Sequence, residues 1–254
     1  MQTAQTVRTV QIQPVGGSTA IIEFAGLRFV TDPTVDAPSE PENGRPRRLT
    51  PPARTDLGRL DVALVSHDQH PDNLDAGGRR LLAEIPLVLT TTDGAERLGG
   101  SARGLAPYES HEVGDVRITA LPALHGPHGA EAVLGPVVGF LLSGDGLPTV
   151  YVSGDNASVD VVREIAAFTG PVDVALLFVG GASSPHYFDG ALLTLGNAEA
   201  VEAARILGAR AVVPIHCEGW SHYSQDRTGL TRAFADAGLG HVLVTVPDGA
   251  TVTL

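Results

Sequence analysis

The sequence contains no lysine, one cysteine and one tryptophan. Without lysine, the chain cannot form a Schiff base with a carbonyl substrate and cannot supply the lysine of a P-loop. The single thiol, Cys217, has no internal partner for a disulfide, which is typical of proteins from a reducing cytoplasm. Because the chain also lacks a G-x-S-x-G motif, the common covalent hydrolases are poorly supported.

Long hydrophobic runs are also missing. No stretch reaches the length that a membrane span needs, and the first eight residues lack the basic start and apolar middle of a secretory signal. The formal charge of −12 disfavours nucleic acid as the main partner, because a phosphate backbone favours clustered cations. We therefore expect a cytoplasmic protein that acts on a small molecule, with no membrane partner and with a homo-oligomer left open.

The most reactive stretch of the sequence is His-Asp-Gln-His-Pro-Asp-Asn at residues 67–73, directly after the apolar run 62–65. That run is typical of a buried strand, so the polar cluster should lie where the strand ends. Three further candidates, His125, Asp155 and His216, each lie at the end of another apolar run. Imidazoles and carboxylates gathered at strand ends can bind metal, and the sequence therefore predicts a two-metal site.

Strands come first in the predicted order and then alternate with helices, which favours two packed sheets with helices outside and one domain over residues 1–254. The C-terminal residues carry one further signal. Residues 242–246 and 251–254 flank Pro247-Asp-Gly249 and predict a closing hairpin. We expect strands at 7–13, 20–24, 27–31, 62–65, 87–90, 116–121, 137–142, 149–152, 172–179 and 211–215, and helices at 74–84, 94–98, 158–168, 197–207 and 227–237.

One segment follows no periodic pattern. Six prolines lie between Pro33 and Pro52, with several arginines among them. This stretch, residues 33–54, is too long for an ordinary connection. It is either a flap beside the active site or a surface loop, and the sequence does not decide between them.

The polar motifs resemble those of the metallo-β-lactamase superfamily, and the small bacterial branch that includes ascorbate-6-phosphate lactonase is the most similar. That family has the motif H-x-H-x-D-H followed by single His, Asp and His positions. Here the first motif falls on residues 68–73, and the later ones on His125, Asp155 and His216. The resemblance implies an α/β fold of four layers, αββα, with two mixed sheets flanked by helices.

The resemblance also implies a ligand set for two divalent cations. The first cation would be bound by Asp68, His70 and His125. The second would be bound by Asp72, Asn73 and His216, and Asp155 would bridge the two cations.

Asp68 and Asn73 depart from the family pattern, because each stands where the family has histidine. Oxygen in place of nitrogen makes the site harder, so zinc is favoured but manganese and iron remain alternatives. Three carboxylates would also neutralise more of the metal charge and weaken the site as a Lewis acid. In a second register His67 is the ligand and Asp68 orients it. A third alternative is a degenerate cluster that binds one metal or none.

The predicted activity is metal-dependent hydrolysis, in which a hydroxide held between the metals attacks a lactone or other cyclic ester, with a phosphodiester as the next substrate class. Asp72, His186 and His222 are the catalytic candidates, and either histidine could donate a proton to the leaving group. Trp220 is expected to line the pocket, and Cys217 to point away from the metals. The alternatives are a non-haem iron redox enzyme on the same scaffold and a binding protein with a degraded metal site.

Overall fold

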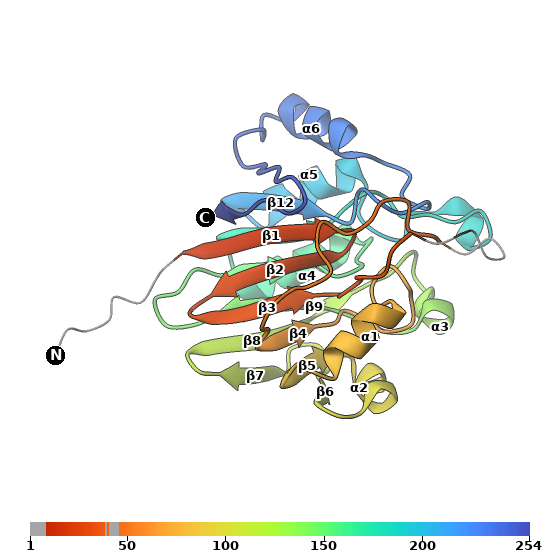
Figure 1. The fold of residues 1–254 in the computed structure, drawn as a ribbon. Helices are drawn as coiled ribbons and strands as arrows, with labels where there is room; N and C mark the ends of the chain where they lie inside the picture. The colour runs from red at the N-terminus through yellow and green to blue at the C-terminus, as the bar shows by residue number, and fades with distance from the viewer. Residues whose placement is uncertain (1–8, 39, 41–45) are drawn as a thin grey trace.

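Two mixed β-sheets packed face to face form the centre of the protein (Figure 1). The computed structural model describes residues 9–38, 40 and 46–254. The first sheet has the order β13 (Val252–Thr253), β1 (Val10–Gly16), β2 (Thr19–Phe24), β3 (Leu27–Thr31), β4 (Val62–Leu64), β5 (Leu87–Thr90) and β6 (Ala102–Gly104). The second has the order β12 (Ala211–Ile215), β11 (Val174–Phe178), β10 (Val150–Val152), β9 (Val137–Ser143), β8 (Val116–Ala123) and β7 (Ser110–Val113).

Helices cover the outer faces of both sheets. The helices α1 (Ala76–Leu82) and α2 (Thr92–Leu98) follow strands of the first sheet, whereas the second sheet carries α4 (Val159–Thr169), α5 (Asn197–Ile206) and α6 (Arg227–Asp236). The short α3 (Glu131–Leu134) and the 3₁₀ turn η1 (Phe188–Gly190) lie in connections. This arrangement confirms the predicted four-layer αββα fold.

Three apolar clusters hold the layers together. The largest lies between the sheets and includes Phe29 of the first sheet and Phe140 of the second, both at most 1% exposed. A second cluster joins the second sheet to α4, α5 and α6, and a third joins the first sheet to α1 and α2. Because each sheet is buried on both faces, its central strands are nearly continuous apolar runs.

Strand direction places the predicted ligands at one edge of the sandwich. β10, β11 and β12 are parallel, and β8 points the same way because both β8 and β10 are antiparallel to β9. The residues that leave β8, β10 and β12 therefore emerge together. Ser66 lies just beyond β4, and its carbonyl oxygen accepts a hydrogen bond of 3.1 Å from the Val138 amide of β9. This contact ties the end of β4 to the same edge.

The predicted C-terminal hairpin is wrong. Val212 of β12 exchanges hydrogen bonds with Val242 and Val244, at 2.8 Å each, whereas β13 pairs with β1. The turn after Val246 therefore carries the chain from one sheet to the other instead of closing a hairpin. The reason is that residues 242–244 pair with the edge strand β12 and β13 pairs with the edge strand β1. Adding to an existing sheet gives more stabilisation than forming an isolated two-stranded ribbon.

The proline-rich segment packs beside the loop after β12. Leu49 N donates to the Gly219 carbonyl at 2.7 Å, and Ser221 N donates to the Arg47 carbonyl at 3.0 Å. The guanidinium of Arg48 lies over the Trp220 ring, 5.3 Å from its centroid. Residues 47–49 thus contact a loop next to a predicted ligand, which agrees with a flap. Residues 39 and 41–45 of this segment lie outside the described part. Within the described ranges, no helix has the length and apolar character to cross a bilayer.

Candidate metal centre

Three imidazoles meet at the edge formed by the ends of β4 and β8. His67 Nε2 lies 2.8 Å from His70 Nδ1, and His125 Nε2 lies 3.2 Å from the same atom. His67 is fully buried and His125 is 5% exposed. Three nitrogen ligand atoms in so small a space form a group that could hold a transition-metal ion.

The outer nitrogens of two of these rings fix their tautomers. His125 Nδ1 lies 2.7 Å from the Leu193 carbonyl, which can only accept, so Nδ1 carries the proton and Nε2 a lone pair. His67 Nδ1 lies 3.0 Å from Ser66 Oγ, whose own proton goes to Asp32, so its Nε2 is also left unprotonated. A proton on His70 Nδ1 can be donated to His67 Nε2 or to His125 Nε2, but not to both. A cation bound among the three rings would interact with all of these nitrogen lone pairs. The donor set therefore fits a metal ion.

Burial keeps two of these rings, those of His67 and His125, in the neutral form that binds metal. Burial and the nearby His70 and His125 rings hold the pKa of His67 well below its usual range. Burial also lowers the pKa of His125, although the Asp155 carboxylate opposes this effect. Neutral imidazoles are the ligand form, so little proton release is needed before a metal binds.

A second group contains two carboxylates and one imidazole. His216 Nε2 lies 3.1 Å from Asp72 Oδ2 and 3.5 Å from Asp155 Oδ1, and all three side chains are at most 5% exposed. Burial disfavours the charged imidazole of His216, but Asp155 and Asp72 outweigh burial and raise its pKa. Burial alone would raise the pKa of Asp72, whereas His222 and His216 hold it well below its usual value. Without a metal, this group is therefore stabilised by ion pairing.

Asp155 joins the two groups. Its Oδ1 faces His216, and its Oδ2 lies 3.6 Å from His125 Nε2 in the imidazole group. The tight turn before it depends on Gly154, which has φ of +57°. A Cβ at this position would lie 2.7 Å from the Val138 carbonyl oxygen and 2.9 Å from Ser66 Cβ, so glycine allows the two sheets to approach each other.

Asp68 is not part of either group. Its carboxylate accepts hydrogen bonds of 3.1 Å at both oxygens from Arg97 Nε on α2, and Arg79 Nη2 of α1 lies 3.7 Å away. The structure instead brings His67 to the imidazole group, as the second register predicted. Ser66, and not Asp68, holds the outer nitrogen of His67. Two carboxylates, and not three, therefore lie in the two groups, which gives the candidate site one negative charge fewer than the sequence predicted.

Asn73 lies beside the carboxylates, and its amide acts on them. Its Nδ2 donates to Asp155 Oδ1 and to Asp32 Oδ2, both at 3.0 Å. Because both partners are acceptors, this assignment of the amide follows from the network. Asn73 therefore fixes the orientation of Asp155, and its Oδ1 has no hydrogen-bond partner within the described structure.

Asp32 is the supporting residue that the sequence analysis missed. It is fully buried, has φ of +30°, and accepts 2.6 Å hydrogen bonds from both N and Oγ of Ser66. Burial raises the pKa of Asp32 to about 7, although the hydrogen bonds from Asn73 and Ser66 oppose this shift. The sequence could have indicated this role, because Asp32 directly follows the buried strand β3, much as Asp155 follows β10.

The two histidines predicted as proton donors have different surroundings. His222 Nε2 lies 3.0 Å from Asp72 Oδ2, and its side chain is 12% exposed. His186 is exposed, and its ring takes part in no hydrogen bond to a described residue; only its backbone N donates, to Ser184 Oγ. The structure therefore brings His222 to the site and leaves His186 outside it.

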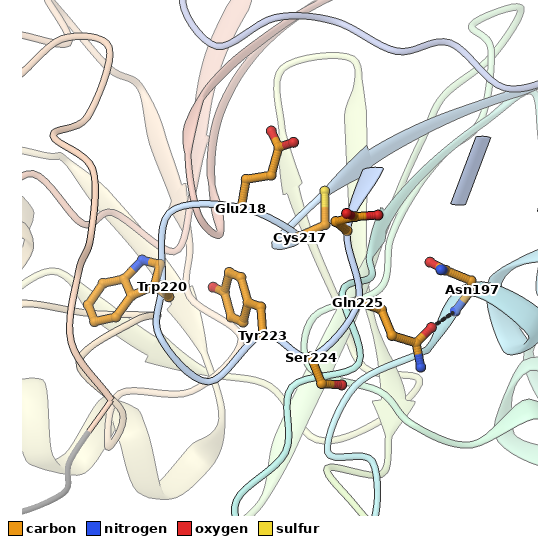
Figure 2. Close-up of a pocket in the computed structure, with 8 residues that line it drawn as sticks. Asn197, Cys217, Glu218, Trp220, Tyr223, Ser224 and Gln225 are labelled. Carbon is orange, nitrogen blue, oxygen red and sulfur yellow. Dashed lines mark hydrogen bonds between the residues drawn. The ribbon is translucent and has the colours of Figure 1, made fainter. Parts of the chain in front are cut away.

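The loop after β12 also encloses a pocket of about 380 Å³ (Figure 2). Trp220 and Tyr223 line it, as does Cys217, but the clustered metal-binding candidates do not. Trp220 is 6% exposed, so it both lines a pocket and is largely buried. Burial raises the pKa of the Cys217 thiol to about 12, which makes a catalytic thiolate unfavourable.

Comparisons with known proteins agree with this geometry. The profile of the beta-lactamase superfamily domain matches residues 27–217. A UPF0173 metal-dependent hydrolase of Methanoregula boonei is 34% identical over 180 residues, 68% of this chain and 73% of that protein. Another from Pyrococcus abyssi is 29% identical over 197 residues, 76% of this chain and 81% of that protein. The crystal structure of an isothiocyanate hydrolase from Delia radicum gut bacteria has a TM-score of 0.82 at 19% identity, covering 95% of this chain and 98% of that one, which shows a shared fold.

Proposed function

Because this chain belongs to the UPF0173 family of metal-dependent hydrolases, within the metallo-β-lactamase superfamily, we propose that it hydrolyses a small ester-type substrate at a centre of two divalent cations. The imidazole group of His67, His70 and His125 would hold one cation. Asp72, Asp155 and His216 would hold the other. A lactone or other cyclic ester is the leading substrate class, and a phosphodiester is the next.

The observation that carries this proposal is the position of the Asp155 carboxylate. One of its oxygens faces His216 and the other faces His125, so a single side chain can contact both cations. Asn73 holds this carboxylate from behind, and Asp32 holds Asn73. Such support fixes ligands before a metal arrives and is commonly required for affinity.

The two groups favour different metals. Three imidazole nitrogens suit zinc, whereas two carboxylates with one imidazole form a harder site that also accepts manganese or iron. When bound, the cations would polarise the bond under attack and make a water molecule nucleophilic near neutral pH. The protein holds the imidazoles of His67 and His125 neutral by burial, and His222 and His216 keep the Asp72 carboxylate ionised.

The test combines metal analysis with two probe substrates. Protein purified without added metal should contain two equivalents of metal by plasma mass spectrometry and should hydrolyse γ-butyrolactone faster than bis(4-nitrophenyl) phosphate. Asp155→Ala should lose both metals and both activities, whereas Asp160→Ala, an exposed aspartate on α4, should keep them. Absence of metal from the wild-type protein, or full activity in Asp155→Ala, would refute the proposal.

A further inference from the structure

The second ligand group lacks an imidazole at the position where the superfamily motif ends in histidine. Asn73 stands there, and its Nδ2 is committed to Asp155 and Asp32 at 3.0 Å each. The side chain thus acts on a neighbouring carboxylate. A neutral amide oxygen is also a weaker ligand for zinc than an imidazole nitrogen. Without Asn73, this group offers three protein ligands, Asp72, Asp155 and His216, where the family pattern has four.

His222 supplies an imidazole at the same place from a distant part of the chain. Its Nε2 lies 3.0 Å from Asp72 Oδ2, and His216 Nε2 lies 3.1 Å from that same oxygen. The two rings approach edge to face, with centroids 6.4 Å apart and an interplanar angle of 86°. Both imidazole nitrogens therefore lie within hydrogen-bond distance of one buried carboxylate oxygen, and a cation bound at that oxygen would have both rings within reach.

The surroundings of His222 hold it in place. Its ring and the ring of His216 both pack on Tyr223, with centroids 4.7 Å and 4.3 Å away. On the other side Trp220 approaches edge-on at 6.3 Å, and the indole is covered by Arg48. The backbone bridge between Arg48 and Trp220 fixes the loop as a whole. The His222 side chain is only 12% exposed, so these contacts hold its ring in a fixed position.

We infer that His222 is a ligand of the second cation and replaces the imidazole that Asn73 does not provide. The second group then has two oxygen and two nitrogen ligands, from Asp72, Asp155, His216 and His222. This set suits a divalent transition metal such as zinc, which can expand to five-coordinate and so keep a position for a water molecule. The inference rests on the proposed two-metal function, and it assigns Asn73 the role of positioning Asp155.

The test measures metal content and the absorption spectrum of the cobalt-substituted protein, neither of which depends on turnover. His222→Ala should retain one equivalent tightly and bind the second at least about 100-fold more weakly, because loss of a ligand exceeds the 10–100-fold cost of losing a supporting group. His222→Gln should behave like His222→Ala, because glutamine keeps a donor for Asp72 but offers no imidazole. His241→Ala, which alters an exposed histidine, is the matched control.

A second variant places an imidazole at position 73, where the family motif has one. Asn73→His combined with His222→Ala should recover the second equivalent and the cobalt spectrum, and thermal melting shows whether each variant is folded. Two tightly bound metals in His222→Ala, or wild-type binding in His222→Gln, would overturn the inference and leave the proposed function intact. Fewer than two metals in the wild-type protein would overturn the two-metal function, and the ligand role of His222 with it.

Discussion

The register of the first motif can be tested by comparing two adjacent residues. Asp68→Asn removes the carboxylate that the family pattern assigns to the metal, and His67→Gln removes the imidazole that lies in the metal group. We expect Asp68→Asn to keep both metals and lose stability, because its carboxylate contacts Arg97 and Arg79. We expect His67→Gln to lose the metal of the imidazole group.

The size of the stability loss follows from the contacts. The Asp68 side chain is 3% exposed, but those of Arg97 and Arg79 are 42% and 44% exposed. Hydrogen bonds to a charged group contribute about 1.5–3 kcal/mol, and the exposure of both arginines favours the lower end. Asparagine keeps one acceptor, so the loss should be about 1.5–2 kcal/mol. For a protein of this size, that change lowers the melting temperature by roughly 3–8 °C.

The assay needs two measurements on each variant. Plasma mass spectrometry gives the metal content after gel filtration, and calorimetry gives the melting temperature at a fixed metal concentration. Asp93→Asn is the matched control, because Asp93 is an exposed carboxylate on the same helix as Arg97. This control should leave the metal content unchanged and should lower the melting temperature less than Asp68→Asn does, because Asp93 is exposed and acts only on the first turn of α2.

One combination of results would refute the reasoning. If Asp68→Asn lost one equivalent of metal while His67→Gln kept two, Asp68 would be the ligand, and its pairing with Arg97 would not persist when metal is present. A loss of metal in both variants would instead show that the two residues act together. Only retention of metal in Asp68→Asn supports the assignment of His67.

Three further predictions concern other parts of the structure. Gly154→Ala, at φ of +57°, places a Cβ 2.7 Å from the Val138 carbonyl oxygen of the same sheet and 2.9 Å from Ser66 Cβ beyond the end of β4 in the other sheet. It should lower the unfolding free energy in urea by about 1–3 kcal/mol. An unchanged value would contradict the close packing around Gly154. Burial raises the pKa of the Cys217 thiol to about 12, so roughly one part in ten thousand of it should be ionised near pH 8. Native protein should therefore react with a disulfide reagent far more slowly than unfolded protein, and equal rates would contradict the burial of the thiol. Ser158→Ala removes the cap of α4 and should cost about 1 kcal/mol in the same urea assay, whereas Ser158→Asp should restore it.

Local signals were sufficient to predict most of the fold. Ser158 before an amphipathic stretch and Gly170 after it define α4, and the structure shows both at the helix ends, where Ser158 accepts from Val161 N and Gly170 has φ of +69°. The buried strands were visible as continuous apolar runs. The C-terminal hairpin failed because its pairing depends on sheet edges formed by β1 and β12, and a turn sequence does not show which edges are open.

The ligands at single positions were easier to place than those inside the first motif. His125, Asp155 and His216 each follow one buried strand, so the end of the strand determines their location. Within residues 67–73 several polar side chains compete, and their directions depend on distant partners. The Asp68 carboxylate, in the loop after β4, accepts a hydrogen bond from Arg97 of α2, which is 29 positions away in sequence. Sequence spacing alone has no information on that contact.

His222 shows why a motif read along the chain gives an incomplete ligand set. It lies 150 positions from Asp72, yet the two side chains are 3.0 Å apart. A histidine lost from the first motif can be replaced from the loop after β12, because that loop already passes the end of β4 to deliver His216. The proline-rich segment then matters for binding, since residues 47–49 pair with residues 219–221 and hold the loop. Shortening the segment should therefore weaken binding of the second metal and leave the imidazole site intact, which metal analysis of the shortened protein would show.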